Sequence, residues 1–304
     1  MLLDLNLSDF IFFSNSNICN KDKLEYSIMV YLLHEFSHFF LSEMFKFNFN
    51  QEDSDEKLDL QNETEKGDAK KCIEHKLKVD YDIAEQNVME TEGLRHVISA
   101  EAVKKIQEKP EYLSEKSDLV KNVYEGGLKI WECSIDLVQY LKNNQISLNK
   151  SLKVLELGCG AALPGLYCLN KVNEVHFQDY NNEVIEHITI PNAALNTSET
   201  KTRFFSGDWT DFLAKMNQES TKYDLILTSE TIYEVANYSK LIDIFDTLLD
   251  SNGKILVAAK IHYFGVGGSL GEFEKHLKPK WKVESVFENC DSVKREIILL
   301  ERCQ

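Results

Sequence analysis

Short apolar runs alternate with amphipathic stretches from residue 126 to the end of the chain. A run of about four to eight mostly apolar residues is typical of a strand that is buried on both faces. The sequence has such runs at 153–157, 175–179, 202–205, 223–229 and 254–260. Apolar residues at three- and four-residue steps between them indicate helices. We expect the first helix to begin at Gly126–Gly127. The other helices should span 162–169, 183–195, 239–250 and 270–277. Strands that alternate with helices predict a doubly wound α/β sheet.

Two more apolar stretches close the chain, at 281–287 and 295–301, and a turn at 289–292 separates them. Two such stretches joined by one short turn predict an antiparallel pair of strands. We therefore assign residues 116–304 to one α/β domain that ends on a β-hairpin.

The chain has a different character before this domain. Residues 1–43 are apolar and rich in Phe, whereas 51–71 are charged and contain almost no large apolar side chains. Such a segment cannot bury enough apolar surface to fold alone. We expect 44–115 to be acidic and largely disordered, with one amphipathic helix at Ala100–Glu108 that ends before Pro110.

The charge of the chain restricts its partners. The net charge is −16, which disfavours direct binding to nucleic acid and suits a basic protein partner. An equally simple reading is that the charge serves solubility. Seven cysteines without Cys-x-x-Cys spacing fit an intracellular protein. The apolar run Ile28–Leu33 is too short to cross a membrane, and we expect a monomer that does not bind membranes.

A glycine-containing loop, Glu156–Gly165, follows the first predicted strand and leads into a helix. Glycines let the backbone turn tightly and approach a ligand. A dinucleotide-binding fingerprint would have a third glycine or alanine where this chain has Leu163. The loop therefore favours S-adenosylmethionine, which has no phosphate, over NAD. The alternative is a structural turn with no ligand.

Acidic residues follow the next two strands. Asp179 ends the second strand, where a carboxylate can accept from both ribose hydroxyls of a nucleoside. Asp208 could accept from an adenine amino group, and Trp209 could cover the ring. The alternatives are a helix cap for Asp179 and a buried structural role for Trp209.

Glu230 and Tyr233 follow the fourth strand and are the candidate catalytic residues. The carboxyl end of this strand faces the ligand in an α/β sheet. The alternative for Glu230 is a solvated or capping role.

One motif points to a different class of enzyme. His34-Glu35-Phe36-Ser37-His38 matches the H-E-x-x-H pattern of zinc metalloproteases. Leu41 stands where the longer metzincin pattern needs Gly, and a third ligand would have to come from the charged segment after residue 51. We therefore expect no metal and keep the metalloprotease only as a distant alternative.

Six segments in order resemble the histidine protein methyltransferases, a branch of the seven-stranded, lysine-methyltransferase-like group. They are 117–133, 154–165, 176–181, 205–209, 223–233 and 258–268. The resemblance implies a Rossmann-like class I methyltransferase sheet of seven strands that ends on the hairpin. Related lysine methyltransferases usually carry D-x-x-Y after the fourth strand. This chain has Glu230 and Tyr233 there, which favours the histidine branch and leaves protein-lysine methylation as the alternative.

The resemblance also implies the cofactor, the contacts and the substrate. The cofactor would be S-adenosylmethionine, held by Ile130, Trp131, Glu132, Cys133, Ser134, Gly158, Gln178, Asp179, Tyr180, Gly207, Asp208, Trp209 and Ser229. The acceptor would be the tele nitrogen of a histidine in a large-subunit ribosomal protein of the L-three type. The family works in the cytoplasm and nucleus, including the nucleolus. Its members tend to begin with Met and alternating Phe, as at 44–50, so we expect 1–43 to be an extension outside the family.

Overall fold

The computed structural model describes residues 70–77, 88–97, 100–109, 119–120, 123–143, 146–196, 200–277, 279–291 and 293–303. All of them belong to one compact unit, Glu65–Gln304. The segment His34–His38 lies outside the described residues.

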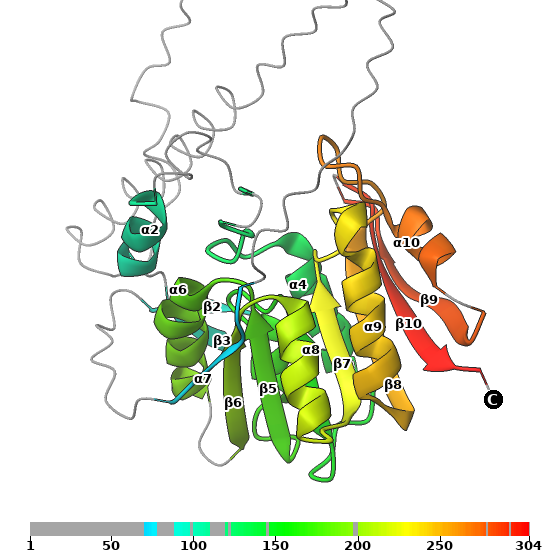
Figure 1. The fold of residues 1–304 in the computed structure, drawn as a ribbon, viewed down its shortest axis with the longest axis horizontal. Coiled ribbons are helices and arrows are strands. Elements are labelled where there is room, and N and C mark those ends of the chain that lie inside the picture. Colours follow the sequence, from blue (N-terminus) through cyan, green and yellow to red (C-terminus); the bar gives the residue numbers. More distant parts are fainter. Residues whose placement is uncertain are drawn as a thin grey trace, which may run out of the picture. The chain divides into compact units, whose positions relative to one another are not determined.

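An eight-stranded sheet forms the centre of this unit (Figure 1), in the order β1-β6-β5-β4-β7-β8-β10-β9. The strands are β1 (Ile73–His75), β4 (Lys153–Leu157), β5 (Glu174–Asp179), β6 (Lys201–Ser206), β7 (Tyr223–Ser229), β8 (Leu249–Lys260), β9 (Trp281–Asn289) and β10 (Arg295–Arg302). Strands β4 to β8 pair in parallel, whereas β10 runs antiparallel to both β8 and β9. The predicted class I methyltransferase sheet with its closing hairpin is confirmed, but it has eight strands rather than the predicted seven because β1 adds to the edge of β6.

Helices cover both faces of the sheet. They are α4 (Glu132–Lys142), α5 (Leu163–Cys168), α6 (Asn182–Val184), the π-helical turn η3 (Ile185–Thr189), α7 (Ile190–Asn196), α8 (Trp209–Gln218), the short 3₁₀ helix η4 (Val235–Asn237), α9 (Tyr238–Leu248) and α10 (Leu270–His276). One core cluster joins α4, α5 and α7 to one face, and a second joins α8, α9 and α10 to the other. No helix in the described ranges is long and apolar enough to cross a membrane.

Alternation along the strands explains why the sequence shows continuous apolar runs. In β4, Val154 belongs to the first core cluster and Leu155 to the second. In β8, Leu256 and Val257 divide in the same way. Successive side chains of a strand point to opposite faces, so a strand between two helical layers needs apolar residues at nearly every position.

The structure differs from the prediction at several element ends. The first helix does not begin at Gly126–Gly127: it begins at Glu132, and the indole of Trp131 donates to the carbonyl of Gly126, 3.0 Å away, across the preceding turn. Strand β8 begins at Leu249, five residues before the predicted start, and Gly253 lies inside it. Helix α8 was not predicted.

Residues 44–115 contain more regular structure than the sequence predicts. The predicted helix is present as α2 (Ala100–Gln107), but the hairpin of β2 (Val88–Thr91) and β3 (Leu94–Val97) was not predicted. Strand β1 was also not predicted, and it adds antiparallel to the edge of β6. Its three residues show no local strand pattern, because the pairing depends on a partner far along the chain.

Candidate active site

A pocket lies where the direction of strand addition reverses. From β4 the chain adds β5 and β6 on one side and then β7 and β8 on the other. Ligands of open α/β sheets bind at this switch point, outside the carboxyl ends of the strands. The pocket and its open mouth together have an empty volume of about 910 Å³.

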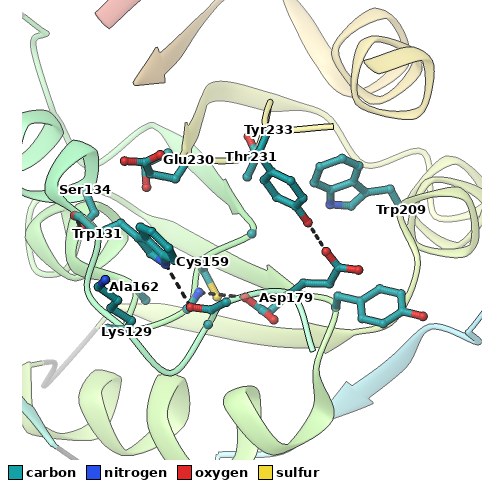
Figure 2. Close-up of a pocket in the computed structure, with 18 of the residues that line it drawn as sticks. Lys129, Trp131, Ser134, Cys159, Ala162, Asp179, Trp209, Glu230, Thr231 and Tyr233 are labelled. Atoms are coloured by element: carbon teal, nitrogen blue, oxygen red, sulfur yellow. Dashed lines mark hydrogen bonds between the residues drawn. The ribbon is translucent and has the colours of Figure 1, made fainter. Parts of the chain in front are cut away.

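Twelve of the fifteen predicted site residues line this pocket. They are Ile130, Trp131, Ser134, Gly158, Asp179, Tyr180, Gly207, Asp208, Trp209, Ser229, Glu230 and Tyr233. Figure 2 shows Trp131, Ser134 and Glu230 on one side and Trp209 and Tyr233 on the other, with Asp179 below them in this view. The other three predicted residues, Glu132, Cys133 and Gln178, lie outside the lining.

The glycine loop passes close beside the segment after β7. Gly158 has φ +59°, and a Cβ there would lie 2.5 Å from Cγ2 of Thr231, so a side chain does not fit. The buried carboxyl of Glu156 accepts from the N–H of Gly165 at 2.8 Å and holds the start of α5. Burial raises the pKa of Glu156 well above its ordinary value. The loop is thus held in place by its own chain.

Asp179 lies on the pocket wall and is 4% exposed. Its two oxygens accept from the backbone N–H groups of Gly160, at 2.9 Å, and Asn181, at 3.0 Å. Burial raises the pKa of Asp179 to about 6, although these two hydrogen bonds oppose the rise. Each oxygen can accept more than one hydrogen bond, so the carboxylate can also take the hydroxyls of a ribose.

Asp208 is already engaged by its own chain. It caps helix α8 by accepting from the N–H of Thr210 at 2.8 Å, and the ammonium of Lys240 lies 2.7 Å from its other oxygen. Burial alone would raise the pKa of Asp208, but Lys240 and Thr210 hold it below its ordinary value. The predicted contact with an adenine amino group would have to share these oxygens.

Gln178 does not line the pocket but supports two residues that do. It is fully buried; its amide donates to the carbonyl of Gly207 at 2.8 Å and accepts from the indole of Trp209 at 2.8 Å. These bonds fix the orientation of the Trp209 ring beside the pocket.

Helical spacing explains which residues of the Ile130–Ser134 segment reach the pocket. Trp131 and Ser134 are three residues apart and therefore share one side at the start of α4. Cys133 is fully buried, and the side chain of Glu132 is 54% exposed and pairs with Lys260 at 3.5 Å. The prediction took the segment as a continuous run, whereas a helix turns its middle residues away.

Glu230 combines three unusual features. It has φ +59°, which is uncommon for a residue other than glycine. Its side chain is 7% exposed, and the ammonium of Lys260 lies 3.4 Å from Oε1. No hydrogen bond to Oε1 is made within the described residues. A buried polar atom without such a bond is costly, and Glu230 also lies on the wall of the pocket.

The side chains of Cys133 and Tyr263, which lie beside Glu230, can donate hydrogen bonds. Burial, followed by the charge of Glu230, raises the pKa of both Cys133 and Tyr263. The thiol and the phenol therefore stay neutral beside the carboxylate. Tyr233, the other predicted catalytic residue, donates its hydroxyl to Glu125, and burial raises the pKa of Tyr233. This hydroxyl already has an acceptor within the protein.

Part of the lining, Cys159–Ala162, belongs to the glycine loop that the sequence predicts to approach a ligand. Several lining residues were not named individually as contacts. They are Glu125, Gly126, Gly127, Lys129, Cys159, Gly160, Ala161, Ala162, Thr231, Asn237 and Lys240. The pair Gly126–Gly127 was a visible signal: a Cβ on Gly127 would lie 2.9 Å from the methyl groups of Val184 and 3.3 Å from Oδ2 of Asp179, so glycine lets the chain pass close to both. Lys240 gave no signal, because only the fold brings α9 beside Asp208.

The segment before β1 also reaches this site. The carbonyl of Lys70 accepts from the N–H of Asp208 at 2.9 Å. The ammonium of Lys70 lies 4.7 Å from the ring centre of Tyr180. Burial lowers the pKa of Lys70.

Comparison with known proteins places this pocket in a family. Residues 107–266 match a family described as lysine methyltransferase. A histidine protein methyltransferase 1 homolog of Rattus norvegicus is 39% identical over 254 residues, which cover 71% of this chain and 70% of the relative. The chain belongs to the histidine protein methyltransferase family. A homolog from Dictyostelium discoideum is 48% identical over 171 residues, which cover 55% of this chain and 54% of the relative.

Two further comparisons limit what membership of the histidine protein methyltransferase family implies. The chain spans about half the length of the first curated relatives that it matches. A protein N-terminal and lysine N-methyltransferase of Candida albicans is 27% identical over 179 residues, which cover 53% of this chain and 67% of the relative. The histidine and lysine branches are therefore both among its relatives.

The residues of the pocket fit S-adenosylmethionine, the methyl donor of the histidine protein methyltransferases. Asp179 offers a buried acceptor for hydroxyl groups, Trp209 offers an aromatic ring, and the glycine loop lets a ligand approach the backbone. The described residues contain no group of three or more His, Cys, Asp or Glu side chains that could hold a metal ion.

Proposed function

We propose that this protein transfers a methyl group from S-adenosylmethionine to the tele nitrogen of a histidine in a large-subunit ribosomal protein of the L-three type. The observation that carries the proposal is Glu230, a buried carboxylate at the pocket with an oxygen that accepts no hydrogen bond among the described residues. Relatives that are 39% and 48% identical and carry the name of histidine protein methyltransferase support the choice of acceptor.

The reaction requires a particular form of the histidine. Bound S-adenosylmethionine supplies a methyl group whose bond to sulfur breaks as the bond to nitrogen forms, and sulfur keeps the electron pair. The attacking nitrogen must therefore be bare, with the proton on the other ring nitrogen. Glu230 would accept a hydrogen bond from that N–H, which fixes the tautomer and stabilises the imidazolium that forms. The rest of the catalysis is positioning by the pocket walls.

Charge supports a basic protein as the partner. The chain carries a net charge of −16, which attracts basic ribosomal proteins over a long range and repels nucleic acid. We propose that the protein acts as a monomer in the cytoplasm and nucleus, including the nucleolus, and binds neither nucleic acid nor membranes directly.

Peptide mass spectrometry of large-subunit ribosomal proteins tests this proposal. In cells that lack the gene, one histidine should lose a single methyl group, and the purified protein with S-adenosylmethionine should restore it. A lost methyl group on a lysine would replace the histidine activity with the lysine alternative. A lysine arrives charged and must lose a proton before it can attack. An unchanged methylation pattern would contradict both activities.

A further inference from the structure

The connection between β8 and α10, residues 261–269, is anchored at its base. His262 and Ser269 form an antiparallel bridge, and the N–H of Tyr263 donates to the carbonyl of Gly268 at 3.0 Å. The N–H of Leu270 donates to the carbonyl of Ile261 at 3.3 Å. These bonds make the connection a short hairpin-like loop with a defined base, which we call the 261–269 loop.

The base of the 261–269 loop contacts the segment after β7, which carries both candidate catalytic residues, Glu230 and Tyr233. The N–H of Gly268 donates to the carbonyl of Tyr233 at 2.8 Å, and a Cβ on Gly268 would lie 2.3 Å from the carbonyl oxygen of Ile232. Tyr263 lies beside Glu230, whose charge adds to burial in raising its pKa. Figure 1 shows this loop, drawn in orange, at the end of the sheet toward which the arrowhead of β7 points.

The tip of the 261–269 loop is apolar and open to solvent. The side chain of Phe264 is 88% exposed, more than any other large hydrophobic residue that the structure describes, and Val266 is 43% exposed. Gly265 and Gly267 have φ of +85° and +89°, and a Cβ at either position would meet nothing within 4 Å. The loop therefore projects its apolar side chains away from its own domain. Exposed aromatic residues are enriched at surfaces that bind proteins.

The groups around the base of this loop favour a basic partner. Glu230 and the half-exposed Glu132 both face Lys260, at 3.4 and 3.5 Å, and the charge of Lys129 also acts on Glu132. Glu234 adds a third carboxylate next to Tyr233. An excess of carboxylates selects a positively charged segment and disfavours an acidic one.

We propose that Phe264 and Val266 are the docking surface for the basic segment that flanks the acceptor residue in the substrate protein. An apolar side chain of that segment packs on Phe264, while its cationic residues lie along the carboxylates near Glu230. The segment then enters the pocket on the side of Glu230, opposite Trp209. This proposal deepens the proposed function and rests on it.

Steady-state kinetics on the full chain test the docking surface. The probe is total large-subunit ribosomal protein from cells that lack the gene, with S-adenosylmethionine labelled in its methyl group. Phe264→Ala should raise the apparent KM for this mixture about tenfold, which corresponds to about 1.4 kcal/mol, and Val266→Ser should raise it less. Both variants should keep kcat and the affinity for S-adenosylhomocysteine, because the tip binds the ground state and the transition state equally.

Val293→Ser is the matched control for Val266→Ser. Val293 is 41% exposed, against 43% for Val266, but it lies in the turn between β9 and β10. The control should leave KM unchanged. A wild-type KM in the Phe264→Ala variant would overturn the docking surface while the proposed function stands, and methylation of no residue by the wild type would end both.

Two other occupants of the apolar tip give different results in the same experiment. If a second copy of the chain covered it, light scattering would show a dimer that Phe264→Ala converts to a monomer. If another segment of this chain covered it, the variant would lower the apparent KM instead of raising it. Either result would overturn the proposal.

Discussion

The two sides of the pocket differ in how completely the protein satisfies its own polar groups. On the side that would hold the methyl donor, Asp179, Asp208 and Gln178 all have hydrogen-bond partners in the chain. On the side that would receive the acceptor, Oε1 of Glu230 accepts no hydrogen bond among the described residues, and Phe264 is almost fully exposed. The first side is complete without the substrate protein, whereas the second is not.

This difference suggests that one side of the pocket contributes mainly to cofactor binding and the other mainly to catalysis. Groups held by their own chain do not need to be ordered when a ligand arrives, which favours tight binding of a cofactor that is exchanged after every turnover. The Oε1 atom of Glu230, which accepts no hydrogen bond among the described residues, would gain one when the correct substrate is in place. Such a bond can contribute to the rate rather than only to binding. Four changes, ordered by expected effect, test this contrast.

The largest effect should come from the buried ion pair that anchors α4. Asp136 is 4% exposed and Arg295 is 7% exposed, with Nε 2.5 Å from Oδ2. Asp136→Ala should lower the free energy of unfolding by about 3–5 kcal/mol, because it leaves a buried guanidinium without its partner. Urea denaturation measures this loss. The control is Asp243→Ala, because Asp243 is exposed and lies in the opposite helical layer. This variant should change the free energy of unfolding by less than about 0.5 kcal/mol. Equal stability of the two variants would mean that the α4 wall is not rigidly held.

Glu230→Gln should act on the rate alone. The amide keeps the shape but loses the charge that stabilises an imidazolium, so kcat should fall by about 10²-fold or more. Affinity for S-adenosylhomocysteine should not change, since Glu230 lies on the acceptor side. Asp243→Asn, which alters an exposed carboxylate on α9 outside the pocket lining, serves as the control. A fully active Glu230→Gln enzyme would remove Glu230 from the mechanism and leave the family assignment intact.

Asp179→Ala should act on binding alone. Loss of a hydrogen bond to a charged group should weaken S-adenosylhomocysteine binding by about 1.5–3 kcal/mol. Calorimetry measures the change and should detect no binding of NAD by the wild type. Tight binding of NAD would contradict the donor side as described.

The smallest effect is a pH dependence that Asp179 should produce. Its pKa is about 6 in the unliganded protein, and a ribose requires the carboxylate form. Affinity for S-adenosylhomocysteine should therefore fall as the pH drops through 6, by up to about tenfold at pH 5, and Asp179→Ala should lose this dependence. For stability the sign is opposite. The unliganded folded state takes up the proton first, so this group raises the free energy of unfolding as the pH falls from about 6 to about 4.

The donor side could be predicted from the sequence because local patterns encode it. The apolar runs located β4 to β10, and the positions after these strands indicated Gly158, Asp179 and Asp208, whereas Ser229 came from the resemblance to the family. Cys133 and Glu132 lie outside the pocket lining, and a linear motif does not state which way a helix turns its residues. The unsatisfied oxygen of Glu230 could not be predicted at all, because it depends on how Lys260, Cys133 and Tyr263 pack around it.

The family match begins at residue 107, and strand β1 lies before it in the sequence. Ile73 pairs with Ser206, so more than a third of the chain separates the two residues that close this edge of the sheet. Contacts between residues so distant in sequence form slowly, so β6 stays an open edge for most of folding. An open edge is a template for strands of other chains. A protein that begins at residue 107 and keeps the rest of the chain would leave that edge open, and we expect it to aggregate by edge-to-edge pairing rather than to lose its fold.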